Sequence, residues 1–425
     1  MAAIDSGDTA WVITATALVM LMTPALGFFY GGLVRRKNLV ATIVQCLAIF
    51  SVVSLVWAMW GYTMTFGPAV HGVIGNFSKL MLLNVGAAPN PALAPTIPEL
   101  LYFAFQLKFA AITPALIIGA FAGRVRFKSL LIFIVLWTTL IYVPIAMWIW
   151  NPGGWLHQLG VMDFAGGLVV HTSAGVSAVA AALVIGRRSD SEARANRPNN
   201  VPFVILGTAL LWFGWFGFNA GSALAANGIA VDALVTTNLA AAAAGVSWML
   251  VDWIRKGQPS AVGMAVGAVC GLAAVTPAAG FVGPSASIVI GLVAGILSNY
   301  VANWRERSKL DDSLDVFACH GVGGMWGTIA TGLFASVAIN SVSGHNGLFF
   351  GNPHQELVQL LGVAIVATFA FVGSFVLLRV INVFSPLRVG PAEEKAGLDM
   401  SEFGEEAYEH GTMPPPPTPA PATGG

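Results

Sequence analysis

Asp163-Phe-Ala-Gly-Gly-Leu-Val-Val-His171 is the stretch from which the fold and the function of this chain are best read. It places a carboxylate and an imidazole in an otherwise apolar, glycine-rich run. A second stretch, Asp315-Val-Phe-Ala-Cys-His320-Gly-Val-Gly-Gly324, repeats this pattern later in the chain. Ionisable groups inside a run that is long enough to cross a bilayer are costly and are usually functional. We therefore expect His171 and His320 to form the functional centre.

The composition indicates that the chain folds in a membrane. Of the 425 residues, 56% are hydrophobic and only 9% are charged, whereas a soluble domain has about 25% charged residues. The formal net charge of zero gives no reason to expect a nucleic-acid partner. The three cysteines lie in apolar runs without the spacing of a metal site or a disulfide, so we expect them to be packing residues.

Eleven apolar runs reach the length of about 20 residues that a spanning helix needs. They lie at residues 10–33, 39–66, 98–121, 129–149, 163–186, 200–222, 231–254, 260–279, 285–303, 314–337 and 357–380. The predicted fold is therefore an all-α integral membrane protein with eleven transmembrane helices. Glycines four residues apart, such as Gly267 with Gly271 and Gly291 with Gly295, should let these helices pack closely.

Positive charge follows the odd-numbered runs. The residues are Arg35, Arg36, Lys37, Arg124, Arg126, Lys128, Arg187, Arg188, Arg194, Arg197, Arg255, Lys256, Arg305, Arg307, Lys309, Arg379 and Arg388. The exits of the even-numbered runs have Lys79 alone. Because Lys and Arg accumulate in cytoplasmic loops, we expect the amino terminus outside and the carboxyl terminus inside.

The two histidines occupy equivalent places in two halves of the chain. His171 lies in the fifth run and His320 in the tenth, so the sequence predicts two inverted five-helix repeats plus one extra helix. Inverted repeats place their site near the middle of the membrane, at the repeat interface. We therefore expect the two imidazoles to meet there.

The chain divides into four segments by composition. Residues 1–9 form a short outer segment that lacks the basic start of a signal peptide. Residues 10–386 form the helical domain, and residues 387–412 form a polar, acidic cytoplasmic segment. Residues 413–425 form a proline-rich tail that is predicted to be disordered.

A facing pair of neutral imidazoles suits the passage of a small polar molecule. Each ring donates from one nitrogen and accepts at the other, so the pair can bond to each other and leave one group each for the molecule. Asp163 lies two helical turns, roughly 12 Å, from His171 and acts at another depth. Its carboxylate caps the helix start, steadies a cation near the pore, or does both. Asp315 is expected to cap its own span.

Aromatic side chains cluster toward the outer ends of several runs. They form either an interfacial belt or a vestibule that attracts a small cation by cation–π contact. Ser222, one turn beyond Phe218, would add a hydroxyl acceptor at that level. The aromatic residues are Phe105, Phe109, Trp148, Trp150, Trp155, Trp212, Trp215, Phe216 and Phe218.

Five stretches, in order along the chain, resemble the ammonium transporter family, the Amt, MEP and Rh superfamily. The likeness is to an Amt-type member and covers residues 10 to 410, of which the Asp-Phe-Ala-Gly-Gly run is a specific signature. The stretches are Phe105-Gln-Leu-Lys-Phe-Ala-Ala-Ile-Thr-Pro-Ala-Leu116, Asp163 to His171, Trp212-Phe-Gly-Trp-Phe-Gly-Phe-Asn-Ala-Gly-Ser222, Asp315 to Gly324, and Gly397-Leu-Asp-Met-Ser-Glu-Phe-Gly-Glu-Glu-Ala-Tyr408.

The resemblance implies a homotrimer in the plasma or inner membrane, each subunit of which takes up ammonium or methylammonium through its own pore. In the family, ammonium loses its proton at an aromatic gate and ammonia crosses, while in many members the histidines pass the proton separately. By position, the resemblance implies an outer cation site at Trp150, Ser222, Phe109 and Asp163, a gate at Phe109 and Phe218, and a pore at His171, His320 and Trp215. Trp148 and Trp155 compete with Trp150 for its place.

Two features qualify the likeness. Lys108 stands between two phenylalanines where the family pattern has no charge, and a positive charge there would oppose cation recruitment unless the side chain points away. The Gly397 to Tyr408 stretch resembles a cytoplasmic segment that packs under the neighbouring subunit, near the face where PII-type regulatory proteins bind. Ser401 matches a threonine that is phosphorylated in plant relatives, and a phosphate beside Glu402 would repel it.

Two alternative functions stay open from the sequence. An ammonium sensor would use the same pore but would need a signalling domain, for which the tail after residue 388 is short. A Rh-type neutral gas channel for NH3 or CO2 would keep the histidines and weaken the outer cation site. An enzyme is disfavoured, because the spans show no metal-ligand triad and no nucleophile beside a base. We therefore expect no cofactor and no metal, and lipid as the surrounding partner.

Overall fold

The computed structural model describes residues 4–189, 198–342 and 344–408. Arg194, Arg197 and the predicted tail at residues 413–425 lie outside these residues. In the first half, the elements are α1 (Ser6–Leu33), η1 (Arg36–Asn38), α2 (Leu39–Val56), η2 (Trp57–Gly61), α3 (Tyr62–Phe66), β1 (Ala69–Val70), β2 (Ile74–Gly75), η3 (Leu80–Leu82), β3 (Pro89–Asn90), β4 (Ala94–Pro98), α4 (Glu99–Ile117), η4 (Ile118–Phe121), α5 (Phe127–Trp137), η5 (Thr138–Tyr142), α6 (Val143–Trp150), α7 (Trp155–Gln158), η6 (Gly167–Thr172) and α8 (Ser173–Ile185).

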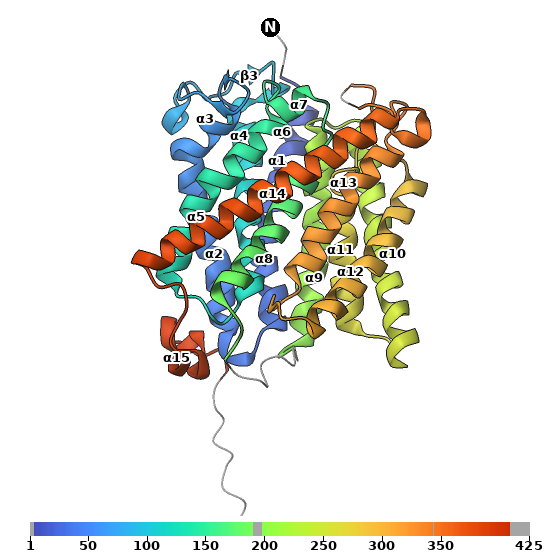
Figure 1. The fold of residues 1–425 in the computed structure, drawn as a ribbon. Coiled ribbons are helices and arrows are strands. Elements are labelled where there is room, and N and C mark those ends of the chain that lie inside the picture. Colours follow the sequence, from blue (N-terminus) through green and yellow to red (C-terminus); the bar gives the residue numbers. More distant parts are fainter. Residues whose placement is uncertain (1–3, 190–197, 343, 409–425) are drawn as a thin grey trace, which may run out of the picture.

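The second half is also helical. Its elements are α9 (Val201–Ala220), η8 (Gly221–Ala223), α10 (Gly228–Lys256), α11 (Ala261–Val275), α12 (Pro284–Arg307), η9 (Phe317–Gly321), α13 (Val322–Phe334), η10 (Leu348–Phe350), α14 (Pro353–Phe384), α15 (Pro391–Ala396) and η11 (Asp399–Phe403). The label η marks short 3₁₀ or π-helical segments. The long helix α14 crosses the bundle obliquely (Figure 1).

Within the described residues, nine helices are long and apolar enough to cross a membrane. They coincide with nine of the eleven predicted runs. The run at 260–279 corresponds to α11, which has only 15 residues. The run at 314–337 corresponds to η9 continued by α13, which together extend from Phe317 to Phe334. The protein is thus a mostly helical, multi-pass membrane protein.

Small residues allow the helices to approach closely. Gly271 of α11 and Gly291 of α12 both face the carbonyl group of Ala240 on α10, and a Cβ at either glycine would collide with that oxygen. Without a hydrophobic drive between helices in lipid, such contacts hold a bundle together by dispersion. The predicted packing role of these glycines is confirmed.

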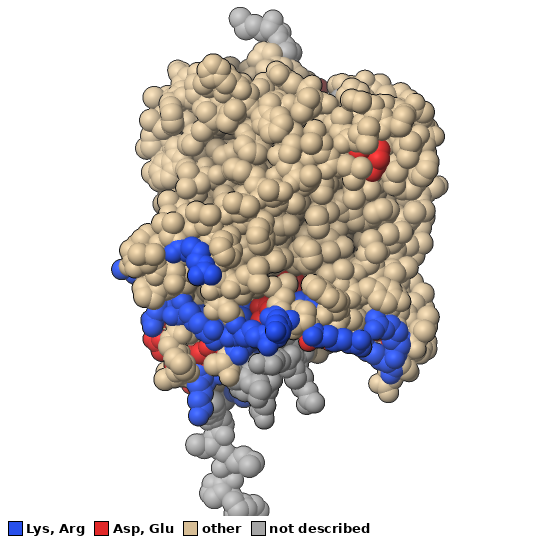
Figure 2. Space-filling model, in the orientation of Figure 1, with Lys and Arg blue, Asp and Glu red and all other residues tan. Residues whose placement is uncertain are grey.

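The two ends of the bundle differ in character. Lys and Arg side chains gather at one end, here called the basic end (Figure 2). The antiparallel hairpins β1–β2 and β3–β4 lie at the opposite end, here called the hairpin end, with Val70 paired to Ile74 and Asn90 to Ala94. The sequence analysis predicted this gathering of Lys and Arg at one end, because these residues follow the odd-numbered runs.

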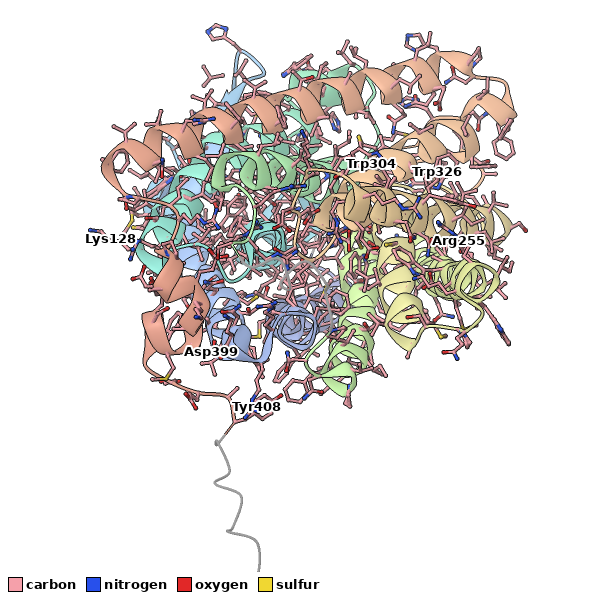
Figure 3. All side chains as sticks on the ribbon, turned by 60° about the horizontal axis from the view of Figure 1, so that its bottom comes forward. Lys128, Arg255, Trp304, Trp326, Asp399 and Tyr408 are labelled. Atoms are coloured by element: carbon pink, nitrogen blue, oxygen red, sulfur yellow. The ribbon has the colours of Figure 1, made fainter. Side chains whose placement is uncertain are left out.

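The carboxyl-terminal segment, residues 389–408, packs on the basic end of its own chain, where Asp399 and Tyr408 lie (Figure 3). The Asp399 carboxylate accepts from Val40 N at 3.1 Å and Ala41 N at 2.8 Å. The Glu402 carboxylate accepts from Phe127 N at 3.0 Å. Because the first amides of a helix have no intrahelical partner, these two acids complete the starts of α2 and α5.

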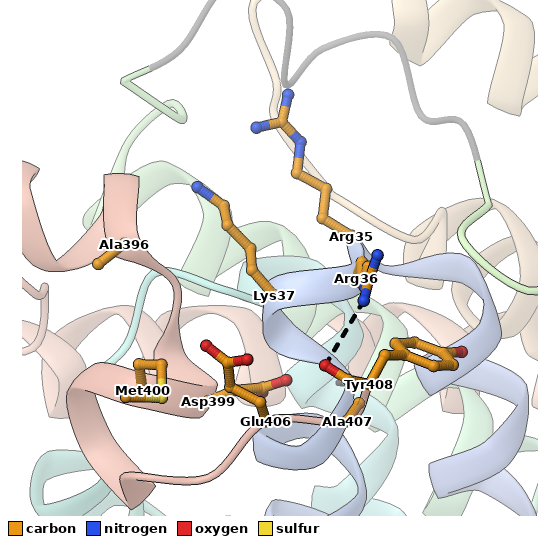
Figure 4. A pocket seen from close by; sticks show the side chains of 9 residues that line it. All are labelled: Arg35, Arg36, Lys37, Ala396, Asp399, Met400, Glu406, Ala407 and Tyr408. Atoms are coloured by element: carbon orange, nitrogen blue, oxygen red, sulfur yellow. Dashed lines mark hydrogen bonds between the residues drawn. The ribbon is translucent and has the colours of Figure 1, made fainter. Parts of the chain in front are cut away.

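A cavity of about 410 Å³ lies between this segment and the loop after α1. The Arg36 guanidinium stacks over the Tyr408 ring at 4.8 Å and donates to the Tyr408 carbonyl at 3.5 Å (Figure 4). The Tyr408 hydroxyl bonds to the side chain of Asn200 at 3.1 Å. The end of the segment is therefore tied to the start of the α2 span, where Arg36 lies, and to the start of α9, where Asn200 lies.

Candidate functional site

The two histidines meet in the middle of the chain's core. The Nδ1 atoms of His171 and His320 lie 3.2 Å apart, and the rings stack with centroids 5.2 Å apart. Both side chains are buried. One Nδ1 donates to the other, so each ring keeps its Nε2 for another partner, and His171 Nε2 has none among the described residues. The prediction that the two rings meet is confirmed.

Local backbone geometry brings the rings together. His171 lies in η6 and His320 in η9, and both segments are π-helical. An extra residue in a helical turn redirects side chains, and such turns often mark functional sites. Helix α8, which continues η6, also crosses η9 at close range, because a Cβ at Gly175 of α8 would collide with the backbone of Gly321 in η9.

The Asp163 carboxylate caps η6. Its two oxygens accept hydrogen bonds from Gly166 N at 2.8 Å, Gly167 N at 2.6 Å, Leu168 N at 2.8 Å and Val169 N at 3.1 Å. This saturates the free amides at a helix start. The capping interpretation is confirmed, and the carboxylate points into the backbone of η6.

Asp315 does not cap its span, so that prediction is wrong. Its backbone is left-handed, with φ at 57°, and its carboxylate forms a two-point ion pair with Arg305 at 2.8 and 2.9 Å. Asp312 takes the capping role and accepts from Phe317 N at 2.8 Å. It precedes His320 by eight residues, as Asp163 precedes His171. That repeated spacing was the signal in the sequence.

Arg124 joins the loop before η9 to two other helix ends. Its guanidinium is fully buried and donates to the carbonyl groups of Ala120, Gly186 at 2.6 Å and Asp311 at 2.8 Å. The Asp311 carboxylate pairs with Arg188 at 2.6 Å. Burial alone would raise the pKa of Asp311, but hydrogen bonds from Arg188 and the charges of Arg124 and Arg188 lower it to about 2. This ion-pair network fixes the backbone from which η9 begins.

A cavity of about 150 Å³ lies at the hairpin end above the histidines. We call it the aromatic cavity. Its walls come from α4, α6, η8 and the β3–β4 hairpin, and its lining residues are Leu93, Tyr102, Phe105, Gln106, Phe109, Trp150, Phe164, Ser222 and Leu224. Five of these were not singled out from the sequence, namely Leu93, Tyr102, Gln106, Phe164 and Leu224. For Gln106, its place between two phenylalanines was a visible signal.

The structure separates Trp150 from its competitor. Trp150 lines the aromatic cavity and donates to the Asp163 carbonyl at 2.9 Å. Trp148 instead donates to the Val73 carbonyl at 2.9 Å and packs against Trp155. Ser222 Oγ donates to the Phe218 carbonyl at 2.8 Å, which leaves its lone pairs for a donor in the cavity.

Two rings in contact, tilted by 36°, lie between the cavity and the histidines. The centroids of Phe109 and Phe218 lie 4.2 Å apart, and Phe218 lies 6.0 Å from the His171 ring. Trp215 stacks on His171 at 5.3 Å and donates to Thr276 Oγ1 at 2.9 Å. The predicted residues therefore form one column, with the cavity above, the aromatic pair next and the histidine pair below.

Lys108 does not line this column. Its ammonium group lies 5.0 Å from the centroid of the Phe50 ring on α2, away from the aromatic cavity that its neighbours line. The column is therefore lined by rings and uncharged polar groups.

Within the described residues, no group of three His, Cys, Asp or Glu side chains is placed to hold a metal ion.

Comparisons with known proteins identify the family. The sequence profile of the Ammonium Transporter Family matches residues 10–408. The "Ammonium transporter" of Bacillus subtilis (strain 168) is 45% identical over 95% of this chain and 98% of its own length. "Ammonium transporter Amt1" of Archaeoglobus fulgidus is also 45% identical, over 95% of this chain and 100% of its own.

Solved structures agree with the sequence comparison. Saccharomyces cerevisiae Mep2 superposes with a TM-score of 0.89 at 35% identity, over 97% of this chain and 94% of its own. A protein described as "Sensor Amt Protein" superposes with a TM-score of 0.85 at 31% identity, over 93% and 98%. The chain therefore belongs to the ammonium transporter family, and it is a membrane transporter of ammonium rather than an enzyme.

Proposed function

We propose that this transporter recruits ammonium in the aromatic cavity, deprotonates it at Phe109 and Phe218, and conducts ammonia past His171 and His320. The main supporting observation is the histidine contact of 3.2 Å directly below a closed aromatic pair. The imidazoles of His171 and His320 take up the proton and pass it on separately from the ammonia. Ammonium and methylammonium are the substrates, and the aromatic cavity faces the outside.

The chemistry follows from the cost of moving charge. The faces of Trp150 and Phe109 attract a cation, and Ser222 offers a hydroxyl acceptor. Below them the pore is apolar, where a bare ion pays tens of kcal/mol by Born estimates. Ammonium avoids that cost by releasing a proton, whereas potassium has no proton to release. The neutral ammonia then bonds to the imidazole nitrogens.

We extend the proposal to the whole chain. Residues 10–386 form eleven spans when α11 and η9–α13 are counted, with the amino terminus outside and the basic end in the cytoplasm. Asp163 with His171 and Asp312 with His320 are equivalent parts of two inverted five-helix repeats. The protein forms homotrimers in the plasma or inner membrane, and residues 387–412 regulate transport, with a PII-type protein as a partner.

Removing the cation site should weaken substrate recruitment. We expect Trp150→Leu to raise the KM for ammonium about tenfold, since a desolvated cation–π contact contributes about 1–2 kcal/mol, and Ser222→Ala to raise it several-fold. Ammonium-induced current and methylammonium uptake in proteoliposomes give KM and maximal rate. Trp253→Leu, at an exposed tryptophan of α10, is the matched control. A current that saturates and persists in excess potassium supports the transporter, whereas no current in wild type supports the gas channel.

A charge at Ser401 should release the carboxyl-terminal segment. Ser401 is exposed and its Oγ donates to the Gly397 carbonyl at 2.8 Å, beside the Glu402 carboxylate that caps α5. We expect Ser401→Asp to lower the maximal uptake rate at least twofold with an unchanged KM. The new carboxylate would repel Glu402 and Asp399 and so weaken the caps that they form on α5 and α2. Ser401→Ala should retain the wild-type rate. Equal rates for wild type and Ser401→Asp would contradict a regulatory role.

A further inference from the structure

The aromatic cavity contains a buried acceptor that the proposed mechanism does not use. Gln106 lies on α4, one turn before Phe109, and lines the cavity with only 9% of its surface exposed. Its Nε2 donates to the Tyr102 hydroxyl at 3.3 Å. Its Oε1 has no hydrogen-bond partner among the described residues. A buried acceptor without a partner costs about 1–3 kcal/mol, which a ligand in the cavity would recover.

The neighbours of Gln106 fix which end of its amide is free. Tyr102 precedes it by four residues on α4, so the two side chains lie on the same helix face. The Tyr102 ring is itself packed against Phe66, with centroids 5.0 Å apart. Because the amide nitrogen is engaged by Tyr102, the carbonyl oxygen is the end of the amide that has no partner among the described residues.

An uncharged oxygen at this place fits ammonium better than a spherical ion. Ammonium has four N–H donors in a tetrahedral arrangement. The cavity otherwise offers the Ser222 hydroxyl, the Tyr102 hydroxyl, which already accepts from Gln106 Nε2, and the faces of Trp150 and Phe109. A second oxygen on the α4 side lets two N–H groups bond to oxygen while the others face the rings. Hydrogen bonds to a charged partner contribute about 1.5–3 kcal/mol.

We propose that Gln106 is a further ammonium-binding residue, whose Oε1 accepts an N–H of ammonium in the aromatic cavity while Tyr102 holds the amide in register. The inference rests on the proposed function, because it places the substrate in the same cavity. It assigns to Gln106 a share of substrate recruitment and to Tyr102 a positioning role.

The test measures ammonium-induced current in proteoliposomes for wild type, Gln106→Met, Gln106→Asn and Gln106→Glu. Met keeps the length of the side chain and removes the oxygen, so the KM should rise about tenfold with a maximal rate within twofold of wild type. Asn keeps the polarity but withdraws the oxygen by one methylene, and it should give a similar rise. Glu restores an oxygen at the same place and should return the KM to the wild-type value or below it.

A positioning role for Tyr102 predicts a smaller effect. Tyr102→Phe keeps the ring and its packing but removes the group that engages the amide, so the KM should rise two- to threefold. Gln106→Glu combined with Tyr102→Phe should keep the low KM of Gln106→Glu, because a carboxylate presents an oxygen in either orientation. A merely structural role of Gln106 would lower the maximal rate or the yield of folded protein and would leave the KM unchanged.

Reference variants separate this inference from the proposed function. If Trp150→Leu and Ser222→Ala raise the KM but Gln106→Asn does not, Gln106 is not a ligand and the recruitment site stands. If none of the three raises the KM, the proposed recruitment site itself is wrong. If Gln106→Met does not fold, Gln106→Asn and Gln106→Glu decide the matter, and a wild-type KM for Gln106→Asn overturns the inference.

Discussion

An Asp163→Ala variant is expected to lose ammonium transport and to unfold at a much lower temperature than wild type. The carboxylate accepts four backbone hydrogen bonds at the start of η6, and each buried donor left without a partner costs about 1–3 kcal/mol. The π-helical segment that carries His171 would lose its anchor. Thermal unfolding in detergent and methylammonium uptake in proteoliposomes measure the two effects.

Asp163→Asn tells the two interpretations of this residue apart. If the carboxylate acts only as a cap, Asn keeps part of the hydrogen bonding, and stability and uptake should fall together by less than in Asp163→Ala. If its charge also steadies a cation near the pore, Asn should lose far more uptake than its loss of stability accounts for. Asp315→Asn, which breaks only the ion pair with Arg305, is the control. Wild-type behaviour of Asp163→Ala would remove Asp163 from the site.

Replacing His171 with leucine should lower the maximal transport rate by about 10- to 100-fold and leave the KM nearly unchanged. Ammonia in the apolar pore would be left with an unpaired polar group, which costs about 1–3 kcal/mol in a low-dielectric site, and each 1.4 kcal/mol corresponds to about tenfold in rate. The aromatic cavity, which recruits ammonium, is untouched. Current and uptake at saturating ammonium provide the measurement.

The histidines should act as a pair. His320→Leu is expected to have a similar effect, and the double variant should be little worse than either single one, because residues in contact are not additive. His354→Leu, at an exposed histidine of α14, is the matched control and should resemble wild type. Transport at the wild-type rate in the double variant would rule out a role for these imidazoles.

The central column of the site could be predicted from the sequence, because its signals are local. A histidine inside an apolar run is conspicuous, and its repetition at the same place in two halves predicted that His171 and His320 meet. Asp163 lies directly ahead of the helix that it caps, so its role followed from position. The positions of Phe109, Trp150, Phe218 and Ser222 came from resemblance to a family.

Other parts of the site depend on the path of the chain in space. Asp315 is closer than Asp312 to His320 in sequence, but the left-handed turn at Asp315 directs its carboxylate to Arg305 and leaves Asp312 at the helix start. Leu93 and Leu224 line the aromatic cavity from loops, and loops have no periodic pattern from which such positions can be predicted. The shortness of α11 was also hidden, because an apolar run does not show where its helix ends.

Truncating the protein at its carboxyl end also removes contacts that stabilise the helical bundle. A truncation ahead of Asp399 strips the start of α2 of two acceptors, and the same cut takes away the carboxylate at the start of α5. Reduced transport in such a truncated variant therefore has two possible causes. Either the ends of α2 and α5 have lost their caps, or a regulatory segment has been removed. Point substitutions that keep Asp399 and Glu402 in place are the cleaner tool for dissecting control of this transporter.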